Sequence, residues 1–317
     1  MDYMDVSMES PRPTAVIADM ALQSPQPSSR AKAGENAAAL RSCVDVQMRS
    51  PQPSSRAWSG DGLVPRTPTK ALWLQRCENA CAKCPFPCDF AIVPGSKGED
   101  RLVVDCRGDD VLLAVFDGHF SRDVAGFAAR VLPGFVWPSL LLSEQPGEVL
   151  REALLECHNA ARREELQGGS TAVVVAVVGG DVWCCCAGDS RAVAGLRGGG
   201  TRRLSVDHTV DVAEEVARIR SAGGSLDFGR VGGCLPMTRG LGDFSLESEG
   251  FACLPDVDVL PAHEVEFVVL ASDGIWDVLS DEACCALVRE LANANCGAMA
   301  ECLAARARSL GSADDIA

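Results

Sequence analysis

The chain has 317 residues, and its charge is distributed unevenly along the sequence. Residues 1–88 contain 10 basic and 8 acidic side chains, whereas residues 89–317 contain 19 basic and 36 acidic ones, a net charge of −17 with Lys97 as the one lysine. A surface this negative repels nucleic acid and anionic lipid, so we expect neither nucleic acid nor membrane as a partner. A phosphate ligand would need cations from another source.

The composition predicts a soluble intracellular protein with one large core, because 47% of the residues are hydrophobic. No apolar run approaches the roughly 18 residues of a membrane-spanning helix. The N-terminus lacks the pattern of a secretion signal and has Asp2 where myristoylation requires glycine. We therefore expect a cytoplasmic or nuclear monomer whose 16 cysteines are reduced.

Residues 1–70 are rich in Ser, Pro, Ala and Arg, and the octet SPQPSSRA occurs twice, at residues 24–31 and 50–57. Such a segment cannot bury enough apolar surface to offset its chain entropy, so we predict a disordered tail. Ser-Pro phosphorylation sites, or polyproline-type motifs that bind regulators, are the alternatives to an inert linker.

Residues 71–88 are predicted to form a Cys-rich helical linker. Cys77, Cys81, Cys84 and Cys88 follow the spacing C-x3-C-x2-C-x3-C; the first three fall on one helix face, and two prolines end the helix before the fourth. Four thiolates could hold zinc, but structural zinc sites usually separate two cysteine pairs by a longer loop. We favour an apolar helix face that packs on the domain, with metal binding as the alternative.

From residue 89 onward, short β-rich runs alternate with amphipathic helical segments. The predicted strands are residues 90–93, 111–116, 171–178, 182–187, 192–196 and 265–270, and the predicted helices are residues 121–132, 148–166, 210–222 and 281–293. The strands come in clusters, which favours two packed sheets with helices outside over a doubly wound parallel sheet.

Acidic residues recur where these apolar strands end. They are Glu99, Asp100, Asp117, Asp189, Asp273, Asp277, Asp314 and Asp315. Carboxylates that converge on one point repel one another unless cations lie between them, and oxygen ligands suit Mg²⁺ or Mn²⁺. The alternative is that each Asp-Gly pair merely forms a turn. Acidic groups at several strand ends of one domain favour the metal site.

Eight short motifs in this region also occur in one order. They are VFDGH at residues 115–119, GSTA at 169–172, AGDSRAV at 187–193, DH at 207–208, IRSAGG at 219–224, RV at 230–231 followed by TRGLGD at 238–243, ASDGIWDV at 271–278 and SADDI at 312–316. In these motifs, residues 89–317 resemble the metal-dependent type 2C serine/threonine protein phosphatases. The resemblance implies an α+β fold, a four-layer α/β/β/α sandwich of two packed, mainly antiparallel sheets flanked by helices.

The resemblance further implies hydrolysis of phosphoserine and phosphothreonine on phosphoproteins at a site with two Mg²⁺ or Mn²⁺ ions. Asp117 would bridge the two ions. Asp273 and Asp314 would complete the protein ligands of one ion, and Glu99 and the backbone carbonyl of Gly118 those of the other.

Further residues have implied roles around these ions. Asp100 would hold a metal-bound water, and Asp189 and Asp273, with Asp277 as a further candidate, would hold a weaker third ion. A water whose pKa is lowered by the two ions would attack phosphorus without a phosphoenzyme. His119, next to the bridging Asp117, would be the catalytic acid that protonates the leaving oxygen, the alternative being a histidine that merely completes a turn.

Some positions depart from the family pattern. Gly95 stands where the family has an arginine that clamps the substrate phosphate. Lys97 lies nearby and is the candidate substrate-binding residue, although an ammonium cannot reproduce a bidentate guanidinium. Phe120 and Ser121 replace a small Gly-rich pair and narrow the approach to His119.

The usual Asp-Asn-Ile-Thr motif reads Asp314-Asp315-Ile316-Ala317 here, and the C-terminal strand that follows it in the family is missing from this sequence. Its absence either leaves a core strand unpaired or means that the sequence is truncated, and we then expect Asp314 to lie on a frayed terminus.

Two functions compete at this point. The leading hypothesis is a metal-dependent protein phosphatase. The alternative, motivated by Gly95, is a catalytically weak or inactive phosphatase-like binding module, against which the complete set of carboxylates argues. A third possibility is that the tail scaffolds a partner.

Overall fold

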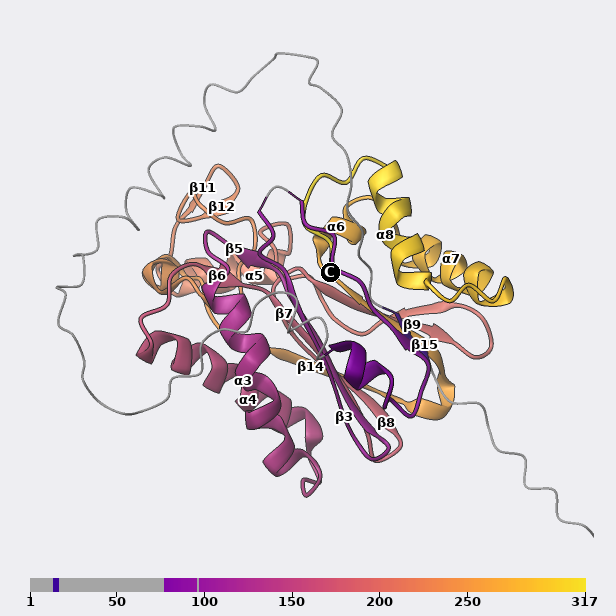
Figure 1. The fold of residues 1–317 in the computed structure, drawn as a ribbon. Helices are drawn as coiled ribbons and strands as arrows, with labels where there is room; N and C mark the ends of the chain where they lie inside the picture. Colours follow the sequence, from indigo (N-terminus) through magenta and orange to yellow (C-terminus); the bar gives the residue numbers. More distant parts are fainter. Residues whose placement is uncertain (1–13, 17–76, 96) are drawn as a thin grey trace, which may run out of the picture.

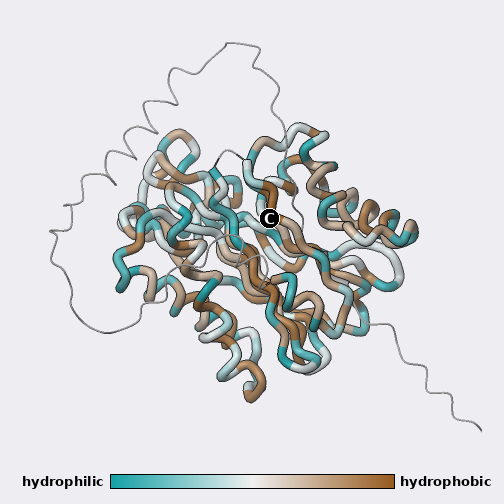
Figure 2. Tube along the Cα trace, in the orientation of Figure 1, coloured by the Kyte–Doolittle hydropathy of each residue, from teal (hydrophilic) through white to brown (hydrophobic). Residues whose placement is uncertain are grey.

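The computed structural model describes residues 14–16, 77–95 and 97–317 (Figure 1). The SPQPSSRA repeats and the start of the predicted linker lie outside these residues. In the described part, two five-stranded sheets lie between two pairs of helices. Hydrophobic residues concentrate along the central strands (Figure 2). None of the described helices is long and apolar enough to cross a membrane.

The first sheet consists of antiparallel strands in the order β14-β8-β7-β4-β3. They are β3 (Arg101–Arg107), β4 (Asp110–Phe116), β7 (Ala172–Val178), β8 (Asp181–Ala187) and β14 (Asp256–Pro261). The apolar runs predict β4, β7 and β8. The two edge strands β3 and β14 were not predicted, because charged residues interrupt their apolar pattern.

The second sheet has the order β10-β9-β15-β1-β2. Its strands are β1 (Thr14–Val16), β2 (Cys88–Asp89), β9 (Arg191–Leu196), β10 (Thr201–Arg203) and β15 (Val265–Ala271). β9 pairs antiparallel with β10 and β15, whereas β1 lies parallel to both β15 and β2. Thr14–Val16 therefore differs from the tail predicted to be disordered, because it pairs with backbone groups of β15 and β2. The strand predicted at residues 90–93 is replaced by β2 and an isolated bridge at Val93.

Helices cover the outer face of each sheet (Figure 1). α3 (Asp123–Leu140) and α4 (Pro146–Arg163) pack on the first sheet, and α7 (Asp281–Asn293) and α8 (Met299–Ser309) on the second. α7 has the predicted bounds. α3 runs eight residues past the predicted end, through Pro133 and Pro138, because Val136, Trp137 and Leu140 on its last turns are buried.

Short elements complete the described fold. They are β5 (Gly118–His119), β6 (Gly169–Ser170), α5 (Ala213–Ser221), β11 (Leu226–Asp227), β12 (Arg230–Val231), β13 (Leu241–Gly242), η1 (Phe244–Glu249), η2 (Ala262–Glu264) and α6 (Asp273–Trp276). β13, β6 and β5 form a small antiparallel sheet that extends from the end of β4.

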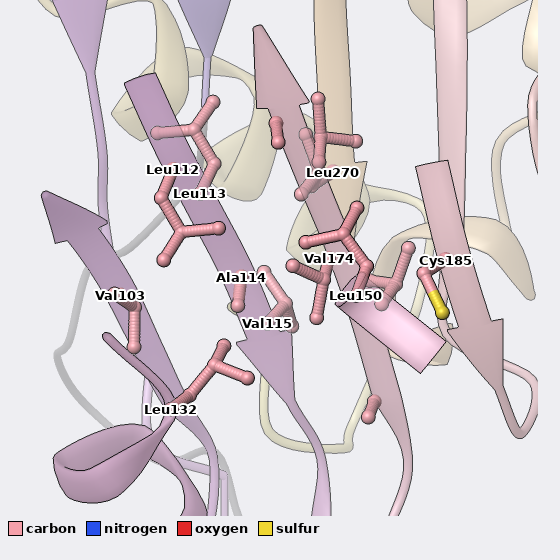
Figure 3. Packing of buried hydrophobic residues seen from close by; sticks show 14 of the residues in the cluster. Val103, Leu112, Leu113, Ala114, Val115, Leu132, Leu150, Val174, Cys185 and Leu270 are labelled. Carbon is pink, nitrogen blue, oxygen red and sulfur yellow. The ribbon is translucent and has the colours of Figure 1, made fainter. Parts of the chain in front are cut away.

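Alternating residues of the second sheet face two separate cores. Leu270 of β15 lies in the main cluster with Leu113 and Val174 of the first sheet (Figure 3). Its neighbour Val269 lies in a second cluster with residues of α7 and α8. The predicted four-layer α/β/β/α sandwich is confirmed.

The cysteines of the linker pack against the main cluster. Cys77 is buried in it, and Cys81, Cys84 and Cys88 lie partly buried against it. The Sγ atoms of Cys81 and Cys88 are 3.4 Å apart. This is the apolar packing that the sequence favoured.

Candidate active site

Strand ends from both sheets bring acidic side chains together. Asp117 follows β4 and Asp189 follows β8 in the first sheet, and Asp273 begins α6 just after β15 of the second. The Asp117 side chain lies within hydrogen-bonding reach of both the Asp100 and the Asp273 carboxyl groups. The structure therefore gathers residues that the sequence predicted from widely separated motifs.

Backbone contacts hold Asp117 in place. Its N–H donates to Thr171 Oγ1 at 3.0 Å, and the Thr171 N–H donates back to the Asp117 carbonyl at 2.9 Å. The Thr171 hydroxyl also contacts the Ser190 hydroxyl at 2.6 Å, next to Asp189. A Cβ at Gly118 would lie 2.8 Å from the carbonyl oxygen of Glu99, so glycine allows these two backbone segments to touch.

The clustered carboxyl groups resist ionisation. Burial, followed by repulsion from neighbouring carboxylates, raises the pKa of Asp100 to about 8, that of Asp189 to about 7 and that of Asp273 to about 6. The same two causes raise the pKa of Asp117 well above its ordinary value. Burial is also the main cause that raises the pKa values of Glu99 and Asp277. Such a cluster is stabilised in its charged form by cations.

Three carboxylate oxygens in this cluster are buried without a hydrogen-bond donor in the part of the chain that the structure describes: Oδ1 of Asp100, Asp189 and Asp273. A buried oxygen without a partner is costly, and such oxygens are the ligands that hard divalent cations prefer. The donor chemistry therefore fits Mg²⁺ or Mn²⁺.

No three Asp, Glu, His or Cys side chains among the described residues already form a group that could hold a metal ion. For the acidic cluster, mutual repulsion opposes a closer approach of the carboxylates. Of the four linker cysteines, Cys88 lies within hydrogen-bonding reach of Cys81 and Cys84, and Cys84 lies within reach of Cys106, whereas Cys77 is buried in the main cluster. Zinc binding by these thiols stays an alternative.

Asp315 ties the segment before β3 to the end of the chain. Its carboxylate accepts backbone N–H groups from Gly95, from Gly98 at 3.1 Å and from Glu99 at 2.7 Å. A Cβ at Gly95 would lie 2.7 Å from the carbonyl carbon of Asp314. This close approach explains why glycine, and no larger residue, stands at position 95.

The expectation that Asp314 lies on a frayed terminus is wrong. Ile316 forms an antiparallel bridge with Val93, and the Ser272 N–H donates to the Ala317 carbonyl at 2.9 Å. Ile316 and Ala317 are fully buried. Asp314 is thus flanked by anchored residues beside β15.

Lys97 lies at the rim of the acidic cluster. Its Nζ is 3.8 Å from Asp314 Oδ1, and both side chains are about half exposed, at 52% and 53%. Partial burial opposes the charge of the ammonium, but the carboxylates of Asp314, Asp117 and Glu99 raise the pKa of Lys97. The ammonium therefore stays charged where a ligand would enter.

His119 is buried and paired with Asp243, at 2.6 Å between His119 Nε2 and Asp243 Oδ2. Burial opposes protonation of the ring, but the charge of Asp243 and its hydrogen bond raise the pKa of His119. A Cβ at Gly169 would collide with both side chains, so this glycine of β6 makes room for the pair.

Sequence reasoning missed Asp243 as part of the site and gave Asp315 no role beyond membership of the acidic group. Asp243 lies 124 residues from His119, and Asp315 lies 216 residues from Glu99. Asp243 lies in the TRGLGD motif and Asp315 in the SADDI motif, and membership of these motifs was the one sign of a role that the sequence offered. Local patterns do not show which distant side chains meet.

Comparisons with known proteins agree with this architecture. The family described as Protein phosphatase 2C matches residues 89–316. Protein phosphatase 2C homolog 2 of Hypocrea jecorina (strain QM6a) is 35% identical over 189 residues, which cover 55% of this chain and 43% of that protein. The chain spans about half the length of the curated relatives that match it over the longer alignments.

Two solved structures are also similar. A C. elegans sex-determining protein superposes with a TM-score of 0.64 at 28% identity, covering 71% of this chain and 62% of that one. A serine-threonine phosphatase 2C from Toxoplasma gondii superposes with a TM-score of 0.56 at 25% identity, covering 71% and 92%. Because the family match spans the whole sandwich and all the motifs of the acidic cluster, the chain belongs to the protein phosphatase 2C family.

Proposed function

We propose that this protein is a Mg²⁺- or Mn²⁺-dependent phosphatase that hydrolyses phosphoserine and phosphothreonine on proteins. Family membership supports this function. The observation that carries it is the acidic cluster, in which burial and then mutual repulsion raise the pKa values of carboxyl groups from both sheets, and three of their oxygens are buried without a donor among the described residues. Such a set of oxygen ligands suits hard divalent cations.

The chain offers ligands for two ions. Asp117 would serve both ions, Asp273 and Asp314 would hold one of them, and Glu99 with the Gly118 carbonyl would hold the other. When bound, such ions supply a water of lowered pKa and positive charge for the phosphate. We assign the neighbouring carboxylates of Asp100, Asp189 and Asp277 either to orienting water or to holding a weaker third ion.

His119 is assigned as the general acid. Its Nε2 is engaged by Asp243, whereas its Nδ1 is buried without a hydrogen-bond partner in the described residues. The proton for the leaving serine or threonine oxygen is therefore held at Nδ1, and Asp243 stabilises the charged ring.

Phosphate binding depends on few protein cations. The backbone contact of Gly95 with Asp314 leaves no room for a longer side chain at position 95. Lys97 remains as a point charge at the rim. We expect the KM for phosphorylated substrates to depend strongly on the concentration of Mn²⁺ or Mg²⁺.

The test is hydrolysis of a phosphothreonine peptide by the full chain. We expect turnover with Mn²⁺ and none with a chelator, and Asp273→Asn should lower kcat/KM at least about 100-fold. The matched control is Asp258→Asn, since Asp258 is an aspartate 40% exposed and paired with Arg202 away from the cluster. Turnover that survives chelation, or that Asp273→Asn leaves unchanged, would contradict the proposal.

The alternative function is a phosphoprotein-binding module without turnover, and the steric restriction at Gly95 favours it. Calorimetric titration separates the two. A phosphatase binds Mn²⁺ and hydrolyses the peptide, whereas a module binds the phosphopeptide without consuming it, and absence of Mn²⁺ binding would favour the module.

A further inference from the structure

A strained aromatic residue lies directly beside His119. Phe120 has a φ of 61°, a left-handed conformation that bulky residues rarely adopt. The backbone of this turn is tightly enclosed, because a Cβ at Gly168 would lie 2.6 Å from the His119 carbonyl oxygen and 2.8 Å from the Ser121 nitrogen. The surrounding backbone therefore holds this turn closely, and glycine would suit the φ at position 120 best.

Core packing does not account for a phenylalanine at this position. The Phe120 side chain is 36% exposed and belongs to none of the hydrophobic clusters formed by the described residues. Its ring stands edge-on to the His119 imidazole, with centroids 5.5 Å apart and planes at 81°. An exposed aromatic residue on strained backbone, next to the candidate general acid, is the pattern of a functional position.

We propose that Phe120 is a specificity-determining residue whose ring forms an apolar wall beside His119. It contacts the side chains that flank the phosphorylated residue and selects phosphopeptides with large apolar flanking residues over those with glycine. Acidic flanking residues are disfavoured as well, because residues 89–317 carry a net charge of −17. This inference rests on the proposed phosphatase function.

The chain contains a matched control for backbone strain. Phe228, at the tip of the β11–β12 hairpin, is also a phenylalanine with a left-handed φ, 54°, and its side chain is 92% exposed. Replacing either phenylalanine by glycine relieves the same kind of strain, but only Phe120 adjoins His119.

The experiment compares phosphothreonine peptides of equal length with leucine, glycine or aspartate on both sides of the phosphothreonine. The full chain is assayed with Mn²⁺, and p-nitrophenyl phosphate serves as a substrate without flanking residues. For the wild type we expect kcat/KM to be about 10-fold higher for the leucine peptide than for the glycine peptide, the discrimination that an apolar contact provides. The aspartate peptide should be the poorest substrate.

Three variants test whether Phe120 is the source of the preference for the leucine peptide. Phe120→Gly should abolish the leucine preference, leave p-nitrophenyl phosphate hydrolysis within about 3-fold of wild type and maintain or raise the Tm. Phe120→Leu, which keeps an apolar side chain, should retain most of the preference. Phe228→Gly should raise the Tm and leave the preference intact.

The outcomes separate the two proposals. If p-nitrophenyl phosphate and the peptides are hydrolysed but the wild type has no leucine preference, or Phe120→Gly keeps it, the role of Phe120 is overturned while the phosphatase function stands. An equal loss of preference in Phe228→Gly also overturns the assignment to Phe120. Absence of metal-dependent hydrolysis of every substrate overturns both proposals.

Discussion

The two sheets of the sandwich are assembled in different ways. In the first sheet, β3 pairs with β4 and β7 with β8 along seven-residue strands that follow each other in sequence. The second sheet joins strands from distant segments, and β1 and β2 contribute only three and two residues. The acidic cluster spans both, with Asp117 and Asp189 on the first sheet and Asp273 on the second. The first-sheet half of the site thus rests on two local hairpins joined by the long-range pairing of β4 with β7, whereas Asp273 follows β15, both of whose partner strands are distant in sequence.

The second sheet also depends on buried charges. Arg191, at the start of β9, is 9% exposed and donates to Asp281 at 2.6 Å and to Asp207. Arg203 of β10 also donates to Asp281, at 2.8 Å. These ion pairs tie the second sheet to the first turn of α7, whereas apolar contacts dominate around the central strands of the first sheet.

Among the variants that test the difference between the two sheets, Asp281→Asn should have the largest effect on stability. Removal of one partner of a buried ion pair should lower the free energy of unfolding by about 3–5 kcal/mol at pH 7. Burial alone raises the pKa of Asp281, but hydrogen bonds from Arg203 and Arg191 outweigh it and lower that pKa below 3.8. The stabilisation is therefore complete above pH 3.8 and is lost as pH falls through the folded-state pKa.

Urea unfolding at neutral and acidic pH measures this effect, and the difference between Asp281→Asn and wild type should shrink in acid. The control is Asp258→Asn, which breaks an exposed pair with Arg202 and should cost at most about 1 kcal/mol. Equal destabilisation by the two variants would show that the buried charges do not distinguish the second sheet.

Replacing one buried leucine in each sheet compares the stability of the two sheets directly. Leu113 of β4 and Leu270 of β15 are at most 1% exposed and share the main cluster (Figure 3). Each substitution by alanine should cost about 2–5 kcal/mol. Leu270→Ala should also weaken Mn²⁺ binding more, because β15 has only the three-residue β1 on one side whereas β4 is paired along both sides. Unfolding and calorimetry measure both effects, and equal losses of Mn²⁺ affinity would contradict the expected difference.

Asp243→Asn tests the proton-transfer side of the site, which lies on the extension of the first sheet. It should lower kcat about 10-fold and leave the Kd for Mn²⁺ within about 2-fold of wild type. Because Asp243 raises the pKa of His119, the protonated ring persists to higher pH in the wild type. The alkaline limb of the pH–rate profile should therefore move to lower pH in the variant, and an unchanged profile would argue against His119 as the acid.

The smallest expected effect comes from Ala15→Pro in β1. Proline removes one donor from the ladder, which should cost about 0.5–1.5 kcal/mol. Backbone amides of residues 267–269, which pair with β1, should exchange hydrogen faster. Ala33→Pro, elsewhere in the predicted tail, is the control. Unchanged exchange in Ala15→Pro would mean that β1 does not support the second sheet.

The sequence by itself determined the elements whose pattern is local and strong. The apolar runs of β4, β7, β8, β9 and β15 and the periodicity of α7 are visible within a few residues, so their positions could be predicted. The strands β3 and β14 were missed because their charged residues hide the apolar pattern. The acidic residues at strand ends could be listed from the sequence, because strand ends and motif order are both sequence properties.

Only the tertiary structure decided which distant groups meet. The pairing of His119 with Asp243, the anchoring of Gly95 and Glu99 by Asp315, and the insertion of Thr14–Val16 beside β15 each join segments more than 100 residues apart. Such contacts leave no periodic trace along the chain, because they depend on the close approach of backbones packed in three dimensions. The sequence therefore supplied the candidate residues of the site, and the fold set the partners that hold them.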